Sequence, residues 1–83
     1  NQRNTDSKKD SYTSNLLHNG IPKIAQKIVE EAGELSIASL GDDKKEMIYE
    51  FADLLFHMLV LLEKTEINIE EIWNELASRN NEK

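Results

Sequence analysis

The run from Met47 to Leu62, MIYEFADLLFHMLVLL, constrains the fold of this chain more than any other stretch. It contains no Gly or Pro, and projection as a helix at about 100° per residue distributes apolar side chains around nearly the whole circumference. A helix in water that is apolar on all sides has to be buried on all sides. We therefore expect this run to form the central helix of the domain.

Three polar side chains interrupt the run on a single stripe of that helix. They are Glu50, Asp53 and His57, spaced i, i+3 and i+7. Carboxylates rarely enter apolar surroundings unpaired, because an isolated buried charge costs several kcal/mol or takes up a proton. We therefore expect a cationic group to meet this stripe. A lone histidine such as His57 is more often a hydrogen-bonded core residue than a ligand, and both interpretations stay open.

Length and charge restrict the class of protein. The chain has 83 residues, a formal net charge of −6 and no Cys. Its length predicts one small domain whose thin core would gain from oligomerisation. The acidic balance argues against nucleic acids and membranes as partners. The lack of Cys excludes disulfides and thiolate metal sites, and the lack of a signal peptide or membrane-spanning run leads us to expect a cytoplasmic protein.

The N-terminal part of the chain divides near residue 10. Asn1 to Asp10 is polar and lacks an apolar period, so we expect a mobile arm or the remnant of a first helix. A short helical segment opens at Ser11 and stops at Asn19-Gly20, a typical helix end. The domain itself is expected in residues 11–80.

The remaining sequence predicts three longer helices, so the fold class is all-α. An amphipathic helix is expected from Pro22 to Leu40, ended by Gly41, with Gly33 in its middle. A glycine inside a helix costs about 1 kcal/mol relative to Ala. Close approach of a backbone or a ligand would justify Gly33, and tolerated drift would explain it equally well.

Capping patterns mark the starts of the next two helices. Asp42 or Asp43 is expected to cap the central helix, and Glu46 stands at the capping-box position for Asp43. Asn68 is expected to cap the last helix, with Glu71 three residues further on. We expect these helices to form a small bundle that oligomerisation completes.

Acidic residues form matching pairs on the two middle helices. Glu31 and Glu34 lie one turn apart on the first, and Glu50 and Asp53 lie one turn apart on the second. Helices joined by so short a connection pack as antiparallel neighbours, so the pairs can face each other. Four converging carboxylates would form an all-oxygen site, which suits Mg²⁺ or Mn²⁺.

Simpler interpretations exist for each acidic residue taken alone. The glutamates at 30, 31 and 34 could form a solvated helix face, and Glu50 could pair with Lys27 or Lys23. Two acidic stripes on adjacent helices, however, would repel each other in a core that lacks a counter-ion. The conjunction therefore favours a metal site.

The acidic pattern resembles a known signature. Glu30-Glu31-x-x-Glu34 followed by Glu50-x-x-Asp53 resembles the E-E-x-x-E … E-x-x-D signature of the all-α, MazG-like nucleotide pyrophosphohydrolases. From about Asp10 to Arg79 the chain is similar to the phosphoribosyl-ATP pyrophosphohydrolase family of histidine biosynthesis. The flanking matches are Ser11-Tyr12-Thr13, Leu16-Leu17, Gly20, Lys23-Ile24, Lys27, Tyr49 to His57 and Leu59 to Leu62.

This resemblance implies Mg²⁺-dependent hydrolysis of phosphoribosyl-ATP to phosphoribosyl-AMP and pyrophosphate by a homodimer or higher homo-oligomer. It implies Glu31, Glu34, Glu50 and Asp53 as metal ligands. Glu30 or Glu34 would act as the catalytic base. Candidates for substrate binding are Lys27, for phosphate, and Ser11, Tyr12, Thr13 and His57.

Departures from the family and competing functions keep other interpretations open. Family members generally have a helix before the Ser-Tyr-Thr stretch, and a larger residue is expected in place of Gly33. A housecleaning hydrolase of free (deoxy)nucleoside triphosphates and a non-catalytic helical dimerisation module are the alternatives. For assembly, we expect an exposed apolar patch around Phe56, Val60 and Tyr49 that a second copy covers.

Overall fold

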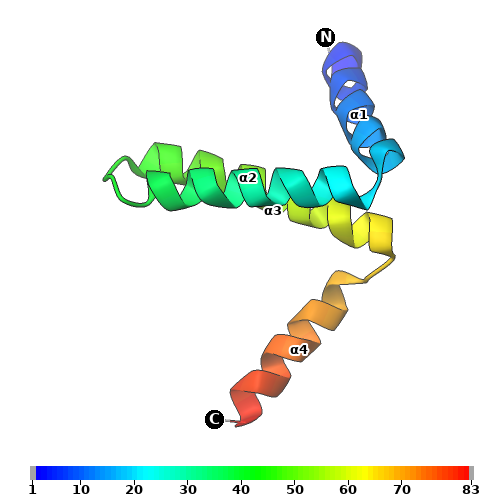
Figure 1. Cartoon of the computed structure of the whole chain (residues 1–83). Helices are drawn as coiled ribbons and strands as arrows, with labels where there is room; N and C mark the ends of the chain where they lie inside the picture. Colours follow the sequence, from blue (N-terminus) through cyan, green and yellow to red (C-terminus); the bar gives the residue numbers. More distant parts are fainter. Residues whose placement is uncertain (1, 83) are drawn as a thin grey trace.

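The computed structural model describes the backbone of residues 2–82 and the side chains of residues 11–80. This part of the chain contains four helices and no strand: α1 (Gln2–Asn19), α2 (Ile21–Ala38), α3 (Lys44–Thr65) and α4 (Ile69–Glu82). The all-α expectation is confirmed. Figure 1 shows α2 and α3 side by side as a hairpin, with α1 and α4 leaving the same end of that hairpin in different directions. None of these helices combines the length and the apolarity that spanning a bilayer requires.

Helix α1 is longer than the sequence pattern predicted. It begins at Gln2 rather than at Ser11. The polar stretch before Ser11 lacks an apolar period, but it also lacks Gly and Pro, so nothing in it ends a helix. The expected stop is present: Gly20 has φ 90°, and its N–H donates to the carbonyl of Leu16 at 3.1 Å. The division of the chain at residue 10 into an arm and a domain stays a prediction.

Helices α2 and α3 are joined by a short turn whose caps follow from the sequence. Helix α2 ends at Ala38, slightly before the expected Leu40. Asp43, rather than Asp42, caps α3, and its carboxylate accepts the backbone N–H of Glu46 at 3.2 Å. The short turn makes the two helices antiparallel neighbours, as predicted.

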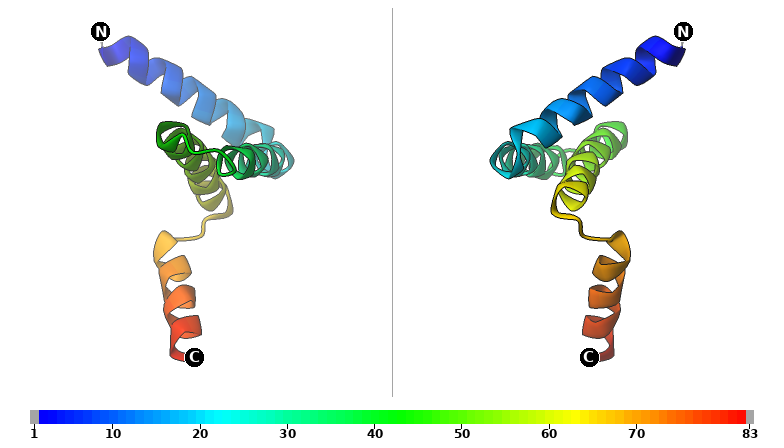
Figure 2. Two further views of the ribbon diagram at one scale, coloured as in Figure 1. Left: turned by 90° about the vertical axis from the view of Figure 1, so that its left-hand side faces the viewer. Right: turned by 90° about the vertical axis from the view of Figure 1, so that its right-hand side faces the viewer.

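The core lies where α1 crosses the open end of the hairpin (Figure 2). Leu16, Ile24 and Val60 form its buried centre, one from each of the first three helices. Val60 is only 5% exposed. Its expected place on an exposed patch is therefore wrong, because α1 covers this side of α3.

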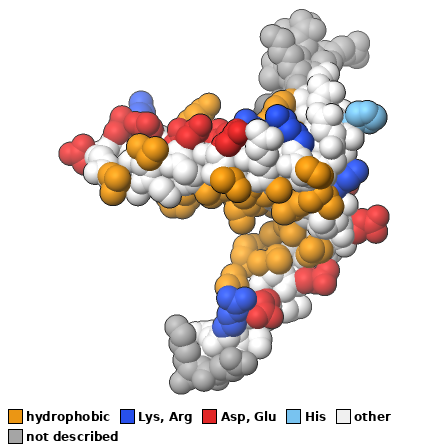
Figure 3. Space-filling view, in the orientation of Figure 1, with side chains coloured by type: hydrophobic (Ala, Val, Ile, Leu, Met, Phe, Trp, Pro, Cys, Tyr) orange, Lys and Arg blue, Asp and Glu red, His pale blue; other side chains and the backbone are white. Residues whose placement is uncertain are grey.

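Much of α3 is open to solvent in the single chain. The expected burial on all sides is met only along the contacts with α1 and α2. Large apolar side chains remain exposed, namely Ile48, Tyr49, Phe51, Leu55, Phe56, Met58 and Leu59. Figure 3 shows hydrophobic side chains gathered on the side of the hairpin that faces α4.

Helix α4 has the predicted capping box but few contacts. The side chain of Asn68 accepts the N–H of Glu70 at 2.8 Å, and the N–H of Asn68 donates to the carboxylate of Glu71 at 3.0 Å. Beyond the cap, α4 projects away from the hairpin and leaves Trp73 and Leu76 exposed. These apolar side chains of α4 therefore stay open to solvent in the single chain.

Candidate metal-binding site

Four carboxylates meet between the two helices of the hairpin. Glu31 and Glu34 come from α2, and Glu50 and Asp53 come from α3. Each offers one oxygen, and these oxygens all lie within 4.8 Å of one another. The antiparallel packing and the i, i+3 spacing on each helix produce this convergence. We call these four residues the acidic cluster.

Burial makes ionised carboxylates costly in the acidic cluster. Glu31 is only 5% exposed, and its Oε1 atom has no hydrogen-bond partner among the side chains of residues 11–80 and the described backbone. Within the same part of the chain, the Oε1 atom of Glu50 is also buried without a partner. An unpaired buried carboxylate oxygen is costly, since it loses water and gains nothing in return. A divalent cation with oxygen preference would supply the missing partner, so the residues fit Mg²⁺ or Mn²⁺.

The pKa values of two carboxyl groups in the acidic cluster are raised by burial and by their acidic neighbours. Burial raises the pKa of Glu31 to about 7, helped by the hydrogen bond and charge of Asp53 and by the charge of Glu34, while Lys27 opposes the shift. Burial also raises the pKa of Glu50, as do the charges of Glu34 and Asp53. Without a metal ion, the Glu31 carboxyl is therefore only partly ionised near neutral pH.

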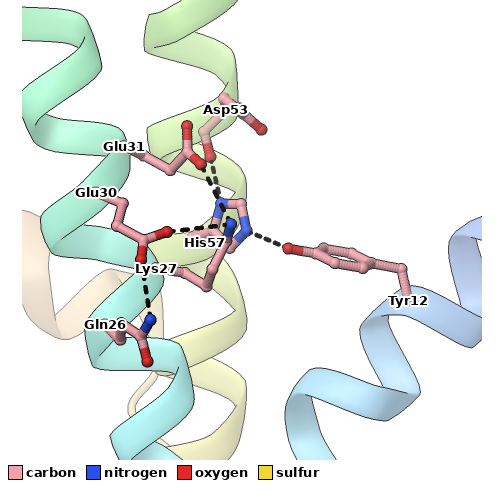
Figure 4. A network of polar contacts seen from close by, with 7 residues as sticks. All are labelled: Tyr12, Gln26, Lys27, Glu30, Glu31, Asp53 and His57. Atoms are coloured by element: carbon pink, nitrogen blue, oxygen red, sulfur yellow. Dashed lines mark hydrogen bonds and ion pairs between the residues drawn. The ribbon is translucent and has the colours of Figure 1, made fainter.

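Lys27 and Glu30 lie at the edge of the cluster on α2 (Figure 4). The ammonium of Lys27 lies 3.4 Å from Glu30 and 3.7 Å from Glu31. Glu30 also accepts a hydrogen bond from Gln26 at 2.9 Å. The bonds from Gln26 and Lys27 lower the pKa of Glu30. Glu30 is therefore an exposed carboxylate that stays deprotonated outside the cluster.

His57 lies next to the cluster with both ring nitrogens engaged. Its Nδ1 lies 2.8 Å from the carbonyl oxygen of Asp53, and its Nε2 lies 2.7 Å from the hydroxyl of Tyr12. The side chain is almost completely buried, at 2% exposed. His57 thus has the contacts of a hydrogen-bonded core residue. One of its nitrogens also lies within 4.8 Å of carboxylate oxygens of Glu31 and Asp53.

The three residues of the Ser-Tyr-Thr stretch are separated by the geometry of α1. Tyr12 points to His57 (Figure 4), whereas Ser11 is exposed. Thr13 is half-buried and lines an apolar groove of about 430 Å³ together with Leu17 and Phe56. The structure therefore brings only Tyr12 of this stretch toward the acidic cluster.

Sequence reasoning missed the role of Phe56, which it placed at an interface. The ring of Phe56 stacks on Tyr12 with centroids 6.0 Å apart and meets His57 edge-on at 5.2 Å. The contact depends on how α1 crosses α3, and no local pattern encodes that crossing. Gln26, which holds Glu30, was also missed, although its i, i+4 spacing to Glu30 was a usable signal.

Comparison with known proteins identifies the family. Residues 1–80 match the sequence model of the family described as phosphoribosyl-ATP pyrophosphohydrolase. The chain belongs to this family. Membership confirms the resemblance that the acidic signature indicated. No solved structure matches the chain.

Curated members of the phosphoribosyl-ATP pyrophosphohydrolase family include several similar relatives. The phosphoribosyl-ATP pyrophosphatase of Trichlorobacter lovleyi is 51% identical over 69 residues, which are 83% of this chain and 64% of the relative. That of Geotalea daltonii is 47% identical over 94% of this chain and 74% of the relative. The histidine biosynthesis bifunctional protein HisIE of Caldanaerobacter subterraneus subsp. tengcongensis is 48% identical over 83% of this chain and 34% of the relative. The chain thus spans 64% of the length of the first of these.

Proposed function

We propose that this chain hydrolyses phosphoribosyl-ATP to phosphoribosyl-AMP and pyrophosphate, a step of histidine biosynthesis, in the cytoplasm. The names of the relatives and the family match support this substrate. The observation that carries the proposal is the buried carboxylate of Glu31, which meets three further carboxylates and has one oxygen without a hydrogen-bond partner among the described residues. A helical scaffold without catalysis would gain nothing from this arrangement.

The acidic cluster would hold Mg²⁺ or Mn²⁺. Glu31, Glu34, Glu50 and Asp53 offer only oxygen, the donor that hard cations prefer. When bound, the ion would neutralise phosphate charge and lower the pKa of a water molecule. The raised pKa of Glu31 supports this assignment, since a bound cation would stabilise the ionised carboxylate and lower that pKa.

Two side chains at the edge of the cluster would act on the substrate directly. Lys27 keeps 26% of its side chain exposed, so its ammonium can donate to a phosphate oxygen. Glu30 is deprotonated and lies outside the cluster, so of the two candidate bases it is better suited than Glu34 to accept a proton from the attacking water. Ser11, Tyr12 and Thr13 stay proposed as contacts of the rest of the substrate, whereas His57, which is buried behind Tyr12, would act through the Tyr12 hydroxyl.

A second copy of the chain would cover the exposed apolar face. Phe51 is 56% exposed on α3, and Trp73 on α4 is also open to solvent. So much apolar surface on one side of a small domain is typical of an interface. We propose a homodimer in which two hairpins pack with two-fold symmetry.

A side-by-side substrate assay tests the activity. Pyrophosphate release from phosphoribosyl-ATP should exceed release from ATP and dATP by about tenfold or more, because a site that recognises the extra phosphoribosyl group discriminates against ligands without it. Equal rates on all three would support a general nucleotide pyrophosphohydrolase instead. Absence of release from any of them would support a non-catalytic module.

A further inference from the structure

The two hydrogen bonds of His57 determine where its protons lie. The partner of Nδ1 is the carbonyl oxygen of Asp53, which can only accept, so Nδ1 carries a hydrogen. In the neutral ring, Nε2 is then an acceptor. Its partner at 2.7 Å is the hydroxyl of Tyr12, which must therefore donate. The hydrogen bonds run in one direction, from Tyr12 through the imidazole to the backbone of α3.

Because Tyr12 donates its hydroxyl hydrogen to His57, it has none left to donate to another group. Its only proton lies on the bond to His57, so its oxygen offers lone pairs and no further hydrogen. Tyr12 is 42% exposed, whereas His57 is 2% exposed, so Tyr12 is the member of this hydrogen-bonded pair that a ligand can reach. Toward a ligand, Tyr12 can accept a hydrogen bond but cannot donate one.

Packing fixes both rings in this arrangement. Phe56 stacks on Tyr12 with an interplanar angle of 25° and meets His57 edge-on at 85°. The three rings join α1 to α3 at a point where a nitrogen of His57 lies within 4.8 Å of oxygens of Glu31 and Asp53. The Tyr12 oxygen is therefore held one imidazole away from the acidic cluster.

We infer that His57 is a positioning residue that presents the Tyr12 oxygen as an acceptor to a donor group of the bound nucleotide, such as a ribose hydroxyl or an amino group. Phosphate oxygens are acceptors, so they have nothing to gain from Tyr12 and would lie with Lys27 and the acidic cluster instead. The inference rests on the proposed function, and it separates the two ends of the ligand. Tyr12 accepts a hydrogen bond from the sugar or base of the nucleotide, and α2 binds its phosphates.

NMR of the histidine side chains tests the geometry without any ligand. Two-bond ¹H–¹⁵N spectra should show His57 as the neutral form with hydrogen on Nδ1. Tyr12→Phe should shift the Nε2 resonance and leave the tautomer unchanged. His18, exposed on α1, is the other histidine and should not respond. Hydrogen on Nε2, or on both nitrogens, would overturn the inference.

Binding of the two proposed products tests the role of Tyr12. Calorimetry with Mg²⁺ should show phosphoribosyl-AMP bound about threefold to tenfold more weakly by Tyr12→Phe, as expected for one lost hydrogen bond. Inorganic pyrophosphate should keep its affinity within about twofold, since it offers acceptors only. His57→Gln should weaken phosphoribosyl-AMP in the same way as Tyr12→Phe. Tyr49→Phe, at an exposed tyrosine of α3, is the matched control and should change neither ligand.

The outcomes separate this inference from the proposed function. Equal weakening of both ligands by Tyr12→Phe would mean that Tyr12 donates to phosphate, which overturns the inference alone. Unchanged binding of phosphoribosyl-AMP would overturn it as well. If neither product binds the wild-type chain, the proposed function fails and the acceptor role fails with it, whereas the NMR result still decides the hydrogen-bond direction.

Discussion

The ammonium of Lys27 lies 3.7 Å from one carboxylate oxygen of Glu31, while the other oxygen of that carboxylate has no hydrogen-bond partner among the described residues. The Glu31 carboxylate thus pairs with a cation of its own helix, and it also has an oxygen within 4.8 Å of carboxylate oxygens of Glu34, Glu50 and Asp53. A single partly exposed ammonium cannot balance four converging carboxylates.

Stability in the absence of divalent metal should fall as pH rises from about 5 to about 8. The pKa of Glu31 is raised from 4.5 to about 7 in the folded protein, so between these values the folded state binds more protons than the unfolded state. The free energy of unfolding then decreases with pH. Glu50, whose pKa is also raised, contributes in the same direction.

Melting temperatures in EDTA across this pH range measure the effect. Glu31→Gln carries no titrating group and should flatten the dependence. Mg²⁺ should raise the melting temperature most at high pH, where the carboxylates are ionised. A wild-type melting temperature that climbs with pH in EDTA, with the same slope in Glu31→Gln, would rule out this account of Glu31.

Lys27→Met should raise KM for phosphoribosyl-ATP by about tenfold, the effect of losing one charge-assisted hydrogen bond to phosphate. Its loss of stability should be small, about 0.2–0.5 kcal/mol, because the ion pair with Glu31 lies along one helix. Lys23→Met, one turn earlier on α2 and exposed, is the matched control. Steady-state kinetics of both variants test the prediction. Equal KM values for Lys27→Met and Lys23→Met would mean that Lys27 does not bind phosphate.

Gly33→Ala should stabilise the protein by about 1 kcal/mol, because Ala favours a helix interior over Gly. In the part of the chain that the structure describes, a Cβ atom at Gly33 would meet nothing within 4 Å beyond its own stretch of helix, so no other backbone approaches it closely. The melting temperature should rise by about 4–8 °C. Gly20→Ala is the opposite case, since φ at Gly20 is 90° and an L side chain is strained there. An unchanged or lower melting temperature for Gly33→Ala would contradict the prediction.

Assembly should respond to the exposed side of α3 and not to its buried side. Phe51→Asp places a charge on the exposed face and should shift the protein toward monomers in analytical ultracentrifugation across a dilution series. Val60→Ala removes core contacts and should cost about 2 kcal/mol without changing the oligomeric state. A compact, active wild-type monomer at every concentration would refute the dimer.

Local patterns predicted the hairpin and its caps because their causes are local. The carboxylate of Asp43 accepts the N–H of Glu46 three residues on. At the start of α4, the side chain of Asn68 accepts the N–H of Glu70, and the carboxylate of Glu71 accepts the N–H of Asn68. The i, i+3 spacing of Glu50 and Asp53 places both on one face of α3 regardless of the rest of the chain.

Features that depend on α1 could not be predicted from such patterns. Its start at Gln2 follows a polar stretch with no apolar period to signal a helix. Its crossing over α3 buries Val60 and joins Tyr12 to His57 across 45 residues of sequence. Crossing geometry is decided by packing among several helices, so it leaves no signal in the sequence of one of them.

The proposed hydrolysis depends on a metal ion held by the acidic cluster. Pyrophosphate release from phosphoribosyl-ATP should therefore be measured for wild type and for Asp53→Asn, each with Mg²⁺ and with EDTA. We expect release by wild type only with Mg²⁺, and none by Asp53→Asn even though its helical circular dichroism is unchanged. An Asp53→Asn variant that releases pyrophosphate at the wild-type rate would show that the acidic cluster does not hold this ion.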